Sequence, residues 1–227
     1  IFLAFFDYLY FFIIIMQHLE NIKKLFSKNF VENPLIESFD TGTINLPTGR
    51  VIACDPLITS DMKEFKINFP QGEFPVLLHK ERESNCVAYV EIIFGEKEII
   101  EWKLATTEDQ NIDDLKGEEI FGYPVESGMG CFMDFETQDS LNHLEKRLFH
   151  RKGAEFMGIY EEFFHEYFFD HNGAIDQFAF LKPDEEKKGN IFAFETGYGE
   201  GFYASYIGFG KDNQPLKLIT EFIEIGS

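Results

Sequence analysis

The sequence predicts an α+β fold dominated by antiparallel β-sheet, either sandwich-like or a strongly curved sheet. Two observations support this prediction. The chain contains 28 Phe among its 227 residues, and segments rich in β-forming residues recur between turns that contain Gly or Pro. A short N-terminal helix and a helical segment around 138–170 are the expected helical parts. Residues 16–227 show no repeat, linker or low-complexity tract, so we expect a single domain there.

The first fifteen residues are almost entirely apolar, with Asp7 as their one charged residue. They lack the basic flank and small-residue cleavage site of a signal peptide. They are also shorter than the ~20 residues that a membrane span needs. We therefore expect 1–15 to be a non-native or remnant hydrophobic leader and Met16 to be the natural start. The alternative is that 1–15 are the end of a genuine membrane anchor.

Apolar residues at helical spacing predict an amphipathic helix over 17–30, which Pro34 would terminate. Its expected apolar face comprises Leu19, Ile22, Leu25 and Phe26. Strands and turns should follow. The expected early strands lie within 43–58 and at 74–79, 86–94 and 98–105. The last two of these are predicted to form a hairpin, because only a short Gly95-containing turn separates them.

The middle of the chain predicts helix. Thr137 is a candidate N-cap for a helix that carries Leu141, Leu144 and Leu148, and Gly153 interrupts it. Aromatic and apolar residues then repeat at helical spacing over 156–167. The final expected strands are 175–181, 190–196, 202–209 and 216–225. Short turns join the last three, which predicts an antiparallel meander.

The charge limits the possible partners. The formal net charge is −20 and the pI is about 4.6. A surface this acidic repels phosphate backbones, so nucleic-acid binding is not expected. It also disfavours anionic membranes, so we predict no membrane partner unless residues 1–15 are an anchor. A solvated acidic surface and selection for a basic protein partner both explain the charge.

The three cysteines, Cys54, Cys86 and Cys131, are far apart in the sequence and form no Cys-x-x-Cys pair. A zinc site or redox motif built on them is not expected. The pattern is typical of small buried hydrophobic residues in a reducing compartment, which predicts a cytoplasmic protein.

The segment Gly197-x-Gly199-x-Gly201 has the glycine spacing of a nucleotide loop, but its context differs. A dinucleotide loop opens a helix, whereas β-forming residues follow here, and Glu200 would repel a phosphate. We therefore expect a β-turn that needs positive φ. No catalytic residue, metal ligand or cofactor is assigned, because no recognisable catalytic or zinc-helix motif is present.

Several acidic residues fall beside Gly, Pro or strand ends. Carboxylates that converge at loop ends can bind a cation or perform acid–base chemistry. The alternative is that Asp and Glu there only build turns and caps. If the turns form a site, its candidate ligand-binding residues are Asp55, Asp134, Glu200 and Tyr203.

Several stretches together resemble an uncharacterised bacterial family, domain of unknown function 4241. They are LPTGRVIACDPL at 46–57, WKLA at 102–105, EIFGYPVESGMGCFMD at 119–134, GYGEGFYASY at 197–206 and LITEF at 218–222. The resemblance covers about 45–225. It implies a bacterial-type protein that starts near Met16, and it implies no activity. The chain departs from the family's usual Asp at Glu126, Glu200 and Glu221, where the longer side chain would disturb a tight metal site.

These observations predict a non-enzymatic binding or immunity-type protein that acts on a basic protein partner. The main alternative is a small-ligand-binding protein or enzyme that uses carboxylates at the glycine-rich turns. A structural or interaction domain without a discrete site is the third possibility.

Overall fold

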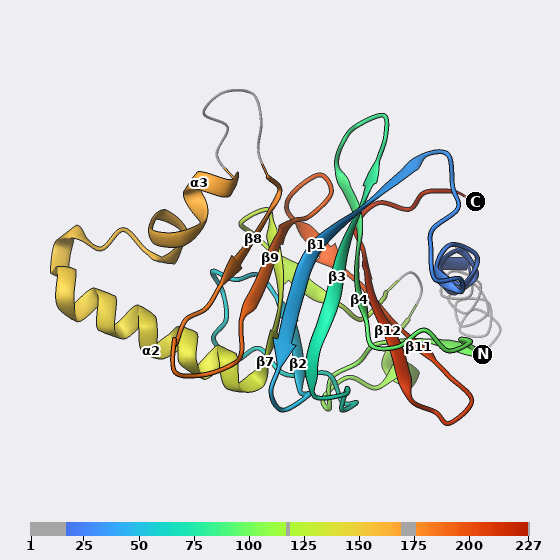
Figure 1. The fold of residues 1–227 in the computed structure, drawn as a ribbon, viewed down its shortest axis with the longest axis horizontal. Helices are drawn as coiled ribbons and strands as arrows, with labels where there is room; N and C mark the ends of the chain where they lie inside the picture. Colours follow the sequence, from blue (N-terminus) through green and yellow to red (C-terminus); the bar gives the residue numbers. More distant parts are fainter. Residues whose placement is uncertain (1–16, 117–118, 169–175, 227) are drawn as a thin grey trace.

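The computed structural model describes residues 17–116, 119–168 and 176–226, and it contains two antiparallel sheets that share one core (Figure 1). The six-stranded sheet has, in spatial order, β1 (Ile36–Leu46), β3 (Gly72–Glu81), β4 (Val87–Ile93), β12 (Pro215–Glu221), β11 (Ser205–Phe209) and β5 (Glu101–Leu104). The four-stranded sheet has β2 (Val51–Cys54), β7 (Met129–Asp134), β9 (Ile191–Glu195) and β8 (Phe178–Leu181). The predicted α+β fold is confirmed.

Helical segments cover the two outer faces of this sandwich. Residues 17–26 form a helix whose apolar residues Ile22, Leu25 and Phe26 pack on the six-stranded sheet, as the amphipathic pattern predicted. On the other side, α2 (Phe135–Lys152) covers the four-stranded sheet (Figure 1). The order of layers is therefore helix, sheet, sheet, helix, and Phe side chains of both sheets fill the space between them.

The second helical stretch is shorter and less regular than its aromatic spacing predicted. After the 3-10 turn Gly153–Glu155, the chain forms a π-helical turn, Tyr160–Phe164, that continues into α3 (His165–Phe168). π-Helical turns often occur at functional sites. This one places Tyr160 beside the end of the four-stranded sheet, where the candidate site lies.

Two predicted strand pairings are wrong, although the strands themselves form. The strand at 86–94 does not form a hairpin with the next one, because β12 and β11 lie between β4 and β5. The predicted terminal meander is also broken, because β9 belongs to the four-stranded sheet and only β11 and β12 pair with each other. A short turn between two strands does not require them to pair when a more apolar neighbour is available elsewhere.

A small two-stranded ribbon lies outside both main sheets. It pairs β6 (Tyr123–Val125) with β10 (Gly201–Tyr203), and Phe202 lies directly opposite Pro124. Both of these residues are exposed, whereas Tyr123 and Val125 point into the core. The ribbon therefore has an outward face.

The predicted leader, residues 1–15, lies outside the described residues, and so does Met16. Within the described part of the chain, no helix has the length and apolarity needed to cross a membrane.

Candidate functional site

A surface cavity of about 460 Å³ lies where the end of the four-stranded sheet meets the turns that lead into and out of the β6–β10 ribbon. We call it the glycine-turn cavity. Its lining residues are Leu57, Ser127, Gly128, Met129, Tyr160, Phe168, Glu195, Thr196, Gly197 and Gly199. Glu195 is the one charged residue in this lining. The cavity is within the size range of ligand pockets.

The turn at 196–199 forms the cavity wall that the sequence predicted to need positive φ. Gly197 has φ +50° and Gly199 has φ +106°, and both values lie in the region that favours glycine. Space is also limited at Gly197, because an added Cβ would lie 3.0 Å from the Cβ of Phe222. This part of the prediction is confirmed: the glycines build a tight β-turn.

Two of the sequence-predicted site residues hold the walls of this cavity from behind. Asp55 is buried, and its Oδ2 accepts hydrogen bonds from the backbone N–H groups of Glu126 (3.0 Å) and Ser127 (2.8 Å). The Tyr203 hydroxyl donates to the Gly199 carbonyl at 2.7 Å. Neither side chain lines the cavity. Instead, both residues hold in place the loops that line the cavity.

Glu195 is the cavity residue best suited to bind a charged ligand. Its Oε2 accepts a hydrogen bond of 2.9 Å from Gln177 Nε2, and it forms no ion pair with any described residue. Burial raises the pKa of the Glu195 carboxyl, while the Gln177 bond and the charge of Lys80 act in the opposite direction. The Lys80 ammonium itself lies over the Phe39 ring, 4.9 Å from its centroid. A half-buried carboxylate without a cation in contact is suited to bind one.

Tyr160 forms the side of the cavity that comes from the π-helical turn. Burial raises the pKa of its hydroxyl, with further contributions from the negative charges of Glu161 and Glu195. The phenol therefore stays neutral at physiological pH and presents both a hydroxyl oxygen that can accept a hydrogen bond and an aromatic face. Either can contact a cation held by Glu195.

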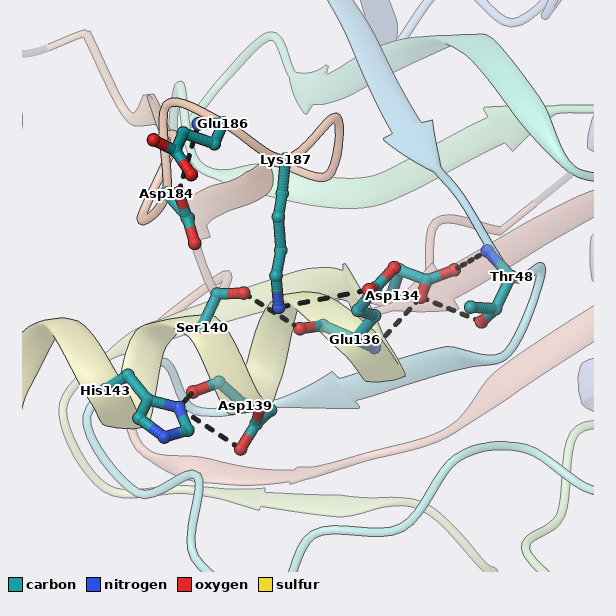
Figure 2. A network of polar contacts seen from close by, with 9 residues as sticks. All are labelled: Thr48, Asp134, Glu136, Asp139, Ser140, His143, Asp184, Glu186 and Lys187. Atoms are coloured by element: carbon teal, nitrogen blue, oxygen red, sulfur yellow. Dashed lines mark hydrogen bonds and ion pairs between the residues drawn. The ribbon is translucent and has the colours of Figure 1, made fainter.

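Asp134 lies at the other end of β7 from Met129, which lines the cavity. Figure 2 shows Asp134 at the start of α2, with Thr48 beside its carboxylate. Its fully buried carboxylate caps α2 by accepting from the Glu136 N–H at 3.0 Å. It also accepts from the Thr48 N–H (2.9 Å), the Thr48 hydroxyl (2.8 Å) and the Gly49 N–H (3.0 Å). The N-cap is thus Asp134 and not Thr137 as predicted, because helix α2 begins at once where β7 ends.

Glu200 is the fourth predicted residue. It is exposed in the turn next to Gly199, at the margin of the glycine-turn cavity. The structure therefore gathers three of the four predicted residues around one cavity, with Asp134 at a distance, but none of them lines it. Their ligand-binding role stays a prediction.

Sequence reasoning missed Glu195, Tyr160 and Ser127. Glu195 had a usable signal, because it is an acidic residue that ends the apolar strand Ile191–Glu195 just before the glycine-rich turn. Tyr160 had none, since its side chain reaches the cavity only through the π-helical turn. Among the described residues, no group of three or more His, Cys, Asp or Glu side chains is arranged to hold a metal ion.

The model of the family described as "Protein of unknown function (DUF4241)" matches residues 44–220. The chain belongs to this family. The match to DUF4241 includes β2, β6, β7, β9 and β10, which are the strands that carry the walls of the glycine-turn cavity. No curated protein and no solved structure matches the chain significantly.

Proposed function

We propose that this DUF4241 protein is a non-enzymatic binding protein of the immunity type that recognises a basic protein partner. In this proposal the glycine-turn cavity receives a cationic side chain of that partner. The observation that carries it is the lining itself, in which the Glu195 carboxylate is the one charged group. A cation in the cavity would meet an acceptor whose charge is only partly compensated.

The surroundings of the cavity support this choice of partner. Glu126 and Glu200 are exposed on the two loops beside it, and the whole chain carries a net charge of −20. An acidic field of this kind accelerates the encounter with a basic protein and suppresses encounters with acidic ones. The walls are held by Asp55 and Tyr203, so the site is formed before a partner arrives.

The defining experiment measures binding of a capped tetralysine peptide by isothermal titration calorimetry in 20 mM NaCl. We expect Glu195→Gln to weaken binding by about 10- to 150-fold, because a hydrogen bond to a charged group contributes about 1.5–3 kcal/mol. Glu98→Gln is the matched control, since it removes the same charge from an exposed residue that pairs with Lys211. The same peptide with acetylated lysines should not bind.

Three results would contradict the proposal. Equal affinity of wild type and Glu195→Gln for tetralysine would remove Glu195 from recognition. Binding of the acetylated peptide would show that charge is not what is recognised. If free methylamine bound as tightly as the peptide, the site would be one for a small cationic ligand, and the protein partner would be abandoned.

A further inference from the structure

A second cavity lies at the opposite end of the β6–β10 ribbon. It has a volume of about 430 Å³ and is lined in part by Phe65, Gly122, Tyr123, Pro124 and Phe202. We call it the ribbon cavity. Ser127 and Gly128, just after β6, line the glycine-turn cavity, whereas Gly122 and Tyr123, at the start of β6, line this one. One short ribbon therefore separates the two cavities.

The ribbon cavity differs in chemistry from the glycine-turn cavity. Aromatic and aliphatic side chains make much of its wall, and Phe202 is 52% exposed at its edge. Of its three charged residues, Lys63 and Asp109 already pair with each other at 2.8 Å, and the third, Asp61, is exposed to solvent. The cavity is thus suited to an apolar side chain, and an exposed aromatic residue at its edge is typical of a residue that anchors a protein interface.

The outward face of the ribbon connects the cavities. Pro124 and Phe202 are paired on this face, and Glu126 and Glu200 are exposed where the ribbon meets the glycine-turn cavity. The outward face thus carries apolar groups along the ribbon and acidic groups at the end next to the glycine-turn cavity. Charge argues against a second copy of this chain as the occupant, because two molecules of net charge −20 repel each other.

We infer that the ribbon and its two cavities form one docking surface for an extended segment of a basic protein. A lysine-type side chain of that segment would enter the glycine-turn cavity, and an apolar side chain would enter the ribbon cavity. Tyr123 and Ser127 lie four residues apart along β6 and the bend after it, so their Cα atoms are at most about 13 Å apart, the length of four residues at the rise of a strand. In an extended segment, residues i and i+4 are about 13 Å apart and point to the same side, so they can reach both cavities.

This inference rests on the proposed function, since it assumes that Glu195 binds the cationic group. The test uses three capped hexapeptides built from Ser and Gly. The first has lysine at the second position and leucine at the sixth, the second has the two adjacent, and the third has lysine alone. We expect the first to bind at least about fivefold more tightly than the other two, because it buries a leucine side chain.

Two matched variants test whether the tighter binding of the first peptide comes from the ribbon. Phe202→Ala should abolish the advantage of the first peptide and leave the affinity for the lysine-only peptide unchanged, which also shows that the variant is folded. Phe149→Ala removes an aromatic side chain that is exposed to a similar extent on α2, and it should leave the advantage intact.

The outcomes separate the two proposals. If Glu195 is needed for binding but all three peptides bind equally, or if Phe202→Ala leaves the advantage in place, the docking surface is wrong and the proposed function stands. If no lysine peptide binds in a manner that depends on Glu195, both proposals fail.

Discussion

Buried and half-buried carboxylates play two different roles in this protein. Asp55 and Asp134 are buried and accept several hydrogen bonds, mostly from backbone N–H groups, so their charge holds loops and a helix end in place. Glu195 accepts one bond from Gln177 and faces a cavity. The number of internal donors therefore separates an acid that stabilises the fold from one that remains available to a ligand.

The availability of Glu195 has a cost in stability that can be measured. Burial raises its pKa in the folded state, so its contribution to stability is fully present below the unfolded pKa and is lost as pH rises through the folded value. Glu195→Gln, which has no such charge, should therefore be more stable than wild type at pH 7. The gain should vanish below about pH 4.5.

Urea unfolding midpoints at pH 7 and pH 4 test this expectation. Glu98→Gln, at an exposed position, should change neither midpoint by more than the measurement error. A Glu195→Gln variant that is less stable than wild type at pH 7 would show that the carboxylate stabilises the fold, which would weaken the case for a binding role.

At the scale of elements, a buried ionic network ties three strands of the six-stranded sheet to the N-terminal helix. Glu91 on β4 contacts His79 Nε2 on β3 at 2.9 Å and Lys217 Nζ on β12 at 2.7 Å. Lys217 Nζ also donates to the Lys28 carbonyl at 2.8 Å, just beyond the helix. Burial by itself would raise the pKa of Glu91, but His79 and Lys217 outweigh it, and the pKa is lowered.

Removing one member of this network should be strongly destabilising. We expect Lys217→Met to lower the free energy of unfolding by about 3–5 kcal/mol, because it leaves the Glu91 charge buried with less compensation. The exposed ion pair Lys211–Glu98 provides the control, and Lys211→Met should cost less than about 1 kcal/mol. Urea denaturation at pH 7 measures both.

The pH dependence of the network has a defined sign. Because the folded-state pKa of Glu91 is lowered, its contribution is present above the unfolded value near 4.5 and is lost as pH falls through the folded value. The difference between wild type and Lys217→Met should therefore shrink in acid. A Lys217→Met variant as stable as wild type at pH 7 would contradict this account of the network.

At the scale of the whole molecule, the net charge of −20 acts on folding and on association in opposite ways. Like charges on one surface repel each other and destabilise the compact state. The same charges attract a basic partner. Salt screens both effects, since the Debye length falls to about 8 Å at physiological ionic strength.

Raising NaCl from 20 to 300 mM should therefore increase the melting temperature by about 2–4 °C for each kcal/mol of repulsion that is screened. The same change should weaken tetralysine binding. Differential scanning calorimetry and titration calorimetry in matched buffers make the comparison. If added salt left the melting temperature unchanged or lowered it, self-repulsion would not be a significant term in the stability of this chain.

Much of the fold follows from local pattern. Runs of β-forming residues between turns predicted strands within 43–58 and at 74–79 and 86–94, and helical spacing predicted a helix from residue 17 with the correct buried face. Local pattern did not determine pairing. The hairpin expected between β4 and β5 is replaced by pairing of β4 with β12, whose residues lie more than a hundred positions later.

The candidate site shows the same division. Composition by itself determined the acidic surface, and glycine spacing determined that 197–199 would be a tight turn. Only the tertiary structure decided that the 127–128 loop faces this turn, because the pairing of β7 with β9 sets Met129 opposite Glu195. Side-chain periodicity is a property of neighbours in the sequence, whereas a cavity forms between residues that long-range strand pairing brings together. For that reason, Glu195 and Tyr160 could be recognised as site residues only in the folded chain.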